Sequence, residues 1–263
     1  MDLLLRPRRR RPLDVVTIPR AIDGAAVLGA MVAGVVWPAS LIGSVPALLG
    51  VHALAAWHPR ATWYGPVVWR MPWPDAIALT FDDGPHPEVT PRVLDQLAEA
   101  GAQATFCVIG ENVRRHPGLV RRMIAAGHTV AVHSDQHRWT FNLRGRVSLL
   151  TDLNRAIAVV AEVSGVRPLW FRPPVGLRNP LVHEVAAALG LRVLTWTANA
   201  RDTQPGNPTQ LAARLCRRMR PGAILVLHDG HEPWRSADRS RCLDILPLVL
   251  AAARTRGCAL RGL

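Results

Sequence analysis

The chain has 263 residues, which is enough for one large domain or two modest ones. Its formal charge of +13 comes entirely from arginine, and the absence of lysine excludes both Schiff-base lysine chemistry and a phosphate-binding P-loop. No zinc-finger, RNP-type or basic-zipper motif occurs, so we expect no nucleic-acid partner. Hydrophobic residues make up 49% of the chain, a share that indicates contact with lipid for part of it.

The N-terminal region divides into a basic arm, residues 1–20, and a hydrophobic segment, residues 21–59. No charged side chain occurs from Gly24 to Pro59. This stretch is too long for a cleaved signal peptide, so we predict a retained membrane segment. A hairpin of two short pieces, 24–37 and 41–57, fits the proline and glycine breaks. A single tilted span and a soluble helical hairpin are the alternatives.

The charges around this segment predict its orientation. The arginine-rich arm favours a cytoplasmic N-terminus at a bacterial-type cell membrane. A hairpin would return the C-terminal domain to the cytoplasm, whereas a single span would export it, and the sequence leaves both open. Residues 60–74 contain four aromatic side chains. We interpret them as an interfacial linker, with a sugar-binding platform as the alternative.

From residue 75 to residue 263, short β-rich runs alternate with helical stretches. This alternation predicts βα units and an α/β domain built on a mainly parallel sheet or barrel. The strand candidates are AIALTF, ATFCVI, HTVAVH, LWF, LRVLTW and AILVLH, and the helical candidates are 90–100, 117–126, 147–164, 180–189, 208–219 and 240–256. Polar side chains follow several strands, at the end where α/β folds gather reactive groups.

Asp82 and Asp83 come directly after the apolar run AIALTF and before a Gly-Pro turn. A solvated Asp-Gly turn would explain them. A metal site is the functional alternative, because one carboxylate could bind the cation while the other acts as a base toward water.

His133 and His137 are four residues apart in HTVAVHSDQH. On a helical turn this spacing would place both imidazoles on one face, within reach of one metal ion. Surface or core histidines are the alternative. Together with Asp83 they would supply two nitrogens and one oxygen and leave coordination positions open, as catalytic zinc sites do.

Three further residues follow later strands. Arg172, in FRPPVG, is held by a loop stiffened by two prolines and could orient a carboxylate. His228, at the end of AILVLH, could act as a general acid near neutral pH. Asp202, in TANARDT, offers another carboxylate. A structural salt bridge or a loop contact would account for each of the three taken alone.

The motifs TFDDG, HSDQH, RPPVG, WTANARDT and LVLHD, in this order, resemble the polysaccharide deacetylase family. This is carbohydrate esterase family 4, with its NodB-homology domain, and the resemblance covers residues 75–263. It implies a deformed (β/α) barrel that removes acyl groups from N-acylated sugars with a divalent metal, usually Zn²⁺. The fourth motif departs from the family pattern, because Asn199 and Thr203 replace an acidic residue and a tryptophan.

The resemblance also implies a role for each candidate. Asp82 would be the catalytic base and Arg172 its positioning partner; His228 would be the general acid, and Asp202 the acidic residue left in the fourth motif. Asp83, His133 and His137 would bind the metal. We therefore expect a membrane-attached N-deacetylase acting on a glycan such as peptidoglycan. A deformylase of a lipid-linked amino sugar and an inactive glycan-binding module are the alternatives.

Overall fold

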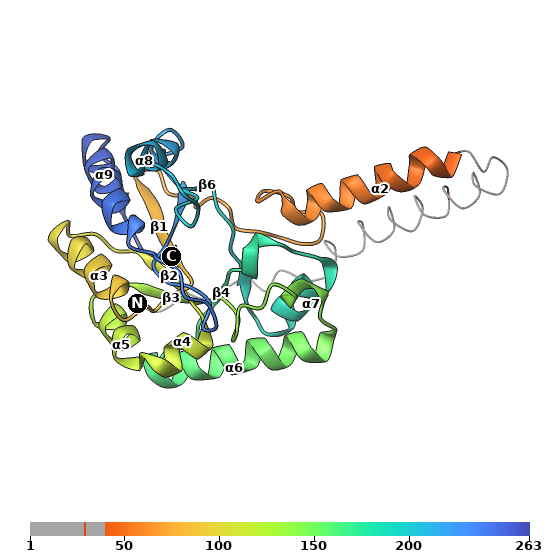
Figure 1. The fold of residues 1–263 in the computed structure, drawn as a ribbon, viewed down its shortest axis with the longest axis horizontal. Coiled ribbons are helices and arrows are strands. Elements are labelled where there is room, and N and C mark those ends of the chain that lie inside the picture. Colours follow the sequence, from red (N-terminus) through yellow and green to blue (C-terminus); the bar gives the residue numbers. More distant parts are fainter. Residues whose placement is uncertain (1–28, 30–39) are drawn as a thin grey trace, which may run out of the picture.

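The computed structural model describes Gly29 and residues 40–263 (Figure 1). The predicted basic arm, residues 1–20, and nearly all of the predicted apolar piece 24–37 lie outside the described residues. The second piece, 41–57, coincides with helix α2 (Ser40–Trp57), which projects from the α/β domain in Figure 1. Within the described part of the chain, no helix is long and apolar enough to cross a membrane, so the predicted transmembrane helix is not found there.

Strand β1 (Ala76–Asp82) is the centre of the sheet, and all seven of its residues are buried. A strand covered on both faces must be apolar at nearly every position, which explains the unbroken run AIALTF. β1 pairs in parallel with β2 (Thr105–Val108) on one side and β7 (Ile224–His228) on the other. The first residues of β1 also pair with β8 (Ala259–Leu260).

The remaining strands extend the sheet on both sides of this centre, again with parallel pairing. The order is β5-β4-β3-β2-β1-β7-β6. The added strands are β3 (Thr129–Val132), β4 (Trp170–Phe171), β5 (Arg192–Val193) and β6 (Ala198–Asn199). The two edge strands, β5 and β6, do not pair with each other. The predicted deformed barrel is therefore a curled parallel sheet, or half-barrel.

Part of the predicted linker, residues 60–74, lies along the open side of the half-barrel. The backbone N–H of Val68 donates to Val193 at the β5 edge, and that of Met71 donates to Gly222 just before β7. Isolated bridges join Val68 to Leu194 and Arg70 to Ala223. These contacts tie the linker to the same sheet that carries the C-terminal strands.

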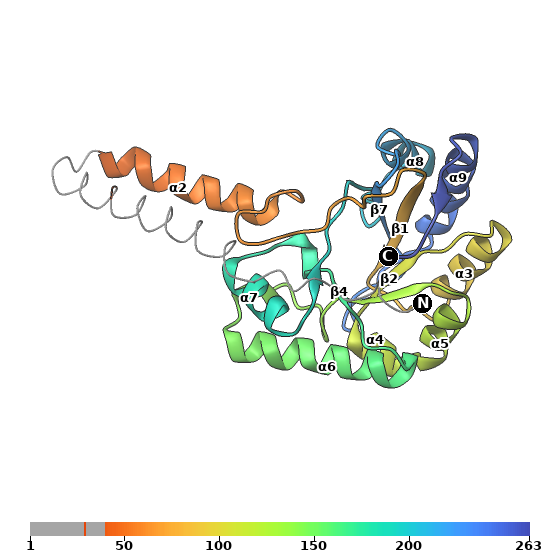
Figure 2. The ribbon, with the colours of Figure 1, turned by 180° about the vertical axis from the view of Figure 1, so that it is seen from behind.

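Helices surround the sheet (Figure 2). They are α3 (Val89–Glu99), α4 (Gly110–Arg115), α5 (Pro117–Ala125), α6 (Arg146–Ser164), α7 (Pro180–Ala188), α8 (Pro208–Cys216) and α9 (Arg241–Thr255). Short 3₁₀ turns occur at Phe141–Leu143 and Pro174–Gly176. Contacts run from α8 to α9, α3, α5, α6 and α7 in turn.

Local sequence explains where two of these helices begin. Asn179 and Asn207 are N-caps, and each is followed by a proline at the first helical position. The Asn179 side chain accepts from the N–H of Val182 at 2.8 Å, which satisfies one of the donors left free at a helix start. The predicted strands and helices from residue 75 onward all occur, while α4, β6 and β8 were not predicted.

Candidate active site

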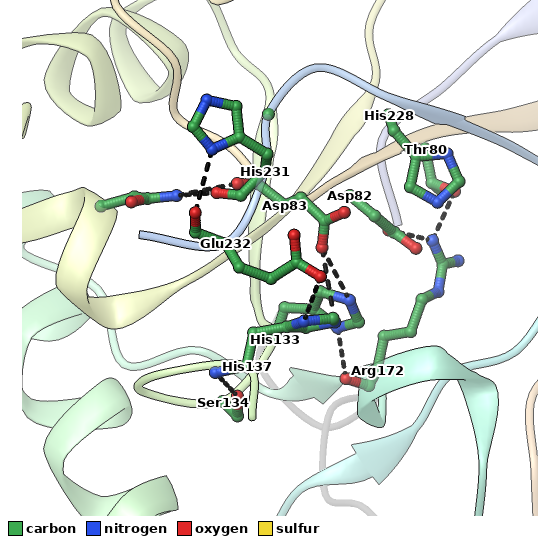
Figure 3. A network of polar contacts seen from close by, with 12 residues as sticks. Thr80, Asp82, Asp83, His133, Ser134, His137, Arg172, His228, His231 and Glu232 are labelled. Atoms are coloured by element: carbon green, nitrogen blue, oxygen red, sulfur yellow. Dashed lines mark hydrogen bonds and ion pairs between the residues drawn. The ribbon is translucent and has the colours of Figure 1, made fainter. Parts of the chain in front are cut away.

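The carboxyl ends of four neighbouring strands bring the candidate side chains together. Asp82, the last residue of β1, is in register with His228, the last residue of β7. On the other side of β1, Val132 of β3 is in register with Phe171 of β4. His133 and Arg172, which follow those two residues, therefore leave the sheet beside each other (Figure 3).

Asp83, His133 and His137 form one buried cluster. Their ligand atoms all lie within 4.8 Å of one another, the one such group among the described residues. The Nε2 atoms of His133 and His137 are 3.5 and 3.4 Å from Asp83 Oδ1. The structure thus brings together all three residues predicted to bind a metal.

The histidine pair is not formed by a helical turn, so that part of the prediction is wrong. Residues 133–138 are a loop, and Ser134 and His137 have left-handed φ values of 69° and 54°. The Ser134 hydroxyl accepts from the N–H of His137 at 2.8 Å. This tight loop places the two imidazole centroids 4.6 Å apart.

The electrostatics of the cluster fit a cation. Burial would raise the pKa of Asp83, but His137 and His133 outweigh it and hold this pKa well below its usual range. Burial also lowers the pKa of His137, which favours the neutral imidazole that metals bind. Asp83 Oδ1 is buried without a hydrogen-bond partner. Two imidazole nitrogens and an unpaired carboxylate oxygen are a suitable donor set for Zn²⁺.

Asp82 has a different environment from its neighbour. Its Oδ1 accepts from Nη1 of the fully buried Arg172 at 2.5 Å. The same Nη1 lies 2.8 Å from Thr80 Oγ1, and Nη2 donates to the carbonyl of Thr195 at 3.2 Å. Burial would lower the pKa of Arg172, yet Asp82 raises it. Arg172 therefore remains a fixed cation that orients the Asp82 carboxylate.

His228 is held by Asp202, the acidic residue that remains in the fourth motif. Asp202 Oδ1 is 2.7 Å from His228 Nδ1, and Asp202 Oδ2 accepts from the His228 backbone N–H at 2.8 Å. Burial would lower the pKa of His228, but Asp202 raises it to about 9. The imidazole is thus protonated at neutral pH. Asn199 instead stabilises the turn, because its side chain accepts from the N–H of Arg201.

Sequence reasoning missed three buried residues around the cluster. Asp229, directly after His228, accepts from the Thr90 hydroxyl at 2.6 Å, and burial raises its pKa to about 7. Asn112 donates to the backbone carbonyl of Asp83 at 2.9 Å. Glu232 places Oε1 3.8 Å from His137 Nδ1. The adjacency of Asp229 to His228 was the available signal, while the other two depend on loop conformation.

The arrangement separates an acid from a base across a potential metal site. An oriented carboxylate, Asp82, lies on one side, and a protonated imidazole, His228, ends the neighbouring strand. Such a pair can remove a proton from an attacking water and deliver a proton to a leaving group. This chemistry suits the hydrolysis of an amide.

Known proteins share this chain's sequence and fold. A family model described as polysaccharide deacetylase matches residues 72–194. The chain is 37% identical over 197 residues to a chitooligosaccharide deacetylase of Sinorhizobium fredii, covering 72% of this chain and 90% of that protein. It is 33% identical over 194 residues to a peptidoglycan-N-acetylglucosamine deacetylase of Bacillus cereus, covering 73% and 88%.

Among solved structures, a family 4 carbohydrate esterase from Streptomyces lividans in complex with acetate matches with a TM-score of 0.65 at 26% identity. The match covers 72% of this chain and 92% of that one. Fold and sequence therefore agree with the motifs TFDDG and HSDQH: the chain belongs to the polysaccharide deacetylase family.

Proposed function

We propose that this protein is a metal-dependent hydrolase that removes N-acetyl groups from an amino-sugar glycan, such as a chitooligosaccharide or peptidoglycan. The observation that carries the proposal is the buried cluster of Asp83, His133 and His137, flanked by the Asp82–Arg172 and His228–Asp202 pairs. The relatives named above act on glycans of this class.

Each pair has a defined task in the proposed reaction. A divalent cation held by Asp83, His133 and His137, which we expect to be Zn²⁺, would stabilise negative charge on the amide oxygen. Asp82, ionised and oriented by Arg172, takes the proton of the attacking water. His228 donates its proton to the departing amine nitrogen, which is otherwise a poor leaving group. Asp202 keeps His228 protonated until that step.

Substitutions separate metal binding from proton transfer. We expect Asp83→Ala and His133→Ala to lose bound zinc, and Asp82→Asn to retain zinc while turnover falls about 10²–10⁴-fold, as for loss of a general base. Metal content and acetate release from N-acetylated oligosaccharides measure the two effects. Asp95→Asn is the matched control, because this carboxylate is 59% exposed in a surface ion pair.

Two results would contradict the proposal. Zinc loss in Asp82→Asn would show that this residue is a ligand and not the base. A zinc-loaded wild-type protein that releases no acetate from any N-acetylated glycan, while it deformylates an amino sugar, would contradict the substrate class. Wild-type protein that binds no zinc, cobalt or nickel and has no activity when these are added would favour the inactive glycan-binding module.

A lipid-linked amino sugar is the second candidate substrate, and helix α2 favours it. Several apolar side chains of α2 are exposed, including Leu49 at 65%, Leu54 at 63% and Trp57 at 64%. Lipid would cover such side chains, so we also propose that this region holds the enzyme at a bacterial-type cell membrane. Reporter fusions at residue 263 test the candidate, because an export-positive fusion would contradict a cytoplasmic lipid-linked substrate.

A further inference from the structure

The two metal-binding histidines differ in what holds their second ring nitrogen. His133 Nδ1 lies 2.6 Å from the backbone carbonyl of Arg172. A carbonyl oxygen only accepts, so Nδ1 of His133 carries the hydrogen and Nε2 presents its lone pair toward Asp83. The backbone thus fixes the tautomer and the ring orientation of His133.

His137 has no backbone acceptor of this kind among the described residues. Its Nδ1 is buried without a hydrogen-bond partner, as is Oε2 of Glu232. Glu232 Oε1 lies 3.8 Å from His137 Nδ1, longer than a hydrogen bond, and the two side chains are only 18% and 8% exposed. Figure 3 shows the Glu232 carboxylate beside the His137 ring.

We propose that Glu232 is the positioning residue for His137 and, through it, for the bound metal. An imidazole that gives its Nε2 lone pair to a cation carries its hydrogen on Nδ1. On His137 that hydrogen faces Glu232, and a small closure between the two would give both buried groups a partner. The inference rests on the proposed metal site at Asp83, His133 and His137.

The loop that carries Glu232 is tied to the metal site. Asn112 Nδ2 donates both to the carbonyl of Asp83, at 2.9 Å, and to the carbonyl of His231, at 3.0 Å. His231 Nδ1 in turn lies 2.9 Å from the carbonyl of Glu232. One amide side chain therefore joins a ligand, Asp83, to the residue that precedes Glu232. This places the carboxylate at a fixed height beside His137.

Metal titration of the full chain tests this role. Carboxylate partners of metal-binding histidines contribute about 10–100-fold to metal affinity. We expect Glu232→Ala to weaken Zn²⁺ binding at the upper end of that range. Glu232→Gln keeps an acceptor oxygen and loses the charge, so we expect a loss of about tenfold. Glu162→Gln, on the exposed face of α6, is the matched control and should bind Zn²⁺ like wild type.

A spectroscopic measurement separates positioning from general stability. We expect the visible absorption bands of the Co²⁺-loaded protein to shift in Glu232→Ala, because His137 then becomes a weaker and less ordered ligand. A variant that only lost stability would keep the wild-type bands once loaded. If Glu232→Ala does not fold, Glu232→Gln decides by the same titration and the same bands.

The outcomes distinguish this inference from the proposed function. If wild type binds Zn²⁺, but Glu232→Ala or, where that fails to fold, Glu232→Gln binds it equally well with unchanged Co²⁺ bands, the role of Glu232 is overturned while the metal site stands. If wild type binds neither ion, the proposed metal site and this inference are both overturned.

Discussion

His228 and Asp202 determine the pH at which the proposed acid loses its proton. Burial alone would lower the pKa of His228, and the Asp202 carboxylate raises it to about 9. The protonated form therefore persists through neutral pH, and kcat/KM should fall as the pH rises through about 9. In Asp202→Asn the raising charge is absent while burial remains, so we expect the alkaline limb to move down by at least about one pH unit.

The pH dependence of kcat/KM for wild type, Asp202→Asn and Asp244→Asn measures this effect. Asp244 is an exposed carboxylate on α9, so Asp244→Asn makes the same charge change away from His228 and should leave the profile in place. The asparagine at 202 still offers an oxygen to the His228 backbone N–H, which favours retention of the loop. An unshifted alkaline limb in Asp202→Asn would show that Asp202 does not set the protonation of His228.

At the scale of elements, sequence pattern predicted the long segments and failed for short ones. Strands such as β1 and β7 are continuous apolar runs, and the helices of nine or more residues from residue 75 onward show periodic apolar faces or capping signals. β6 and β8 have two residues each, too few for any periodicity. Their pairing is decided by tertiary contacts, which no local pattern records.

The site divides in the same way. The residues next to strand ends, such as Asp82 and His228, were predictable because parallel strands gather their carboxyl ends at one edge. Spacing alone suggested a helical turn for His133 and His137, whereas left-handed backbone in the loop brings the rings together. Glu232 reaches His137 only through the conformation of the loop after β7, so no sequence spacing indicated it.

The loops after β1 and β7 pack closely enough to test by a single methyl group. A Cβ on Gly230 would lie 2.3 Å from the backbone oxygen of Asp83. We expect Gly230→Ala to displace Asp83, to lower the free energy of unfolding by about 1–3 kcal/mol, and to weaken Zn²⁺ binding. Urea denaturation and metal titration measure the two effects.

Gly118→Ala is the control for this substitution. Gly118 lies in α5, and an added Cβ would meet nothing within 4 Å. Alanine is favoured over glycine in helices by up to about 1 kcal/mol, so this variant should be as stable as wild type or more stable. Equal stability and equal zinc affinity for Gly230→Ala and wild type would contradict the close packing of the two loops.

In the whole molecule, one loop connects the site to helix α2. Arg172, which orients Asp82, and Arg178 both lie in the loop after β4. Arg178 is buried, and its guanidinium donates to the carbonyls of His58, at 2.7 Å, and Pro59, at 3.2 Å. Burial lowers its pKa to about 10, so it stays cationic at neutral pH. Positive charge at the carboxyl end of a helix is favourable, which fastens α2 to the domain.

Arg178→Met should therefore loosen α2 while the α/β domain stays folded. Loss of hydrogen bonds from a charged donor costs about 1.5–3 kcal/mol, which corresponds to about 10–100-fold faster hydrogen exchange if exchange follows local opening. We expect this acceleration at the amides of His58 and Ala61, which are bonded within the segment. Arg218→Met, at an exposed position, should exchange like wild type. Unchanged protection in Arg178→Met would mean that packing of the α2 end, and not this guanidinium, fixes the helix on the domain.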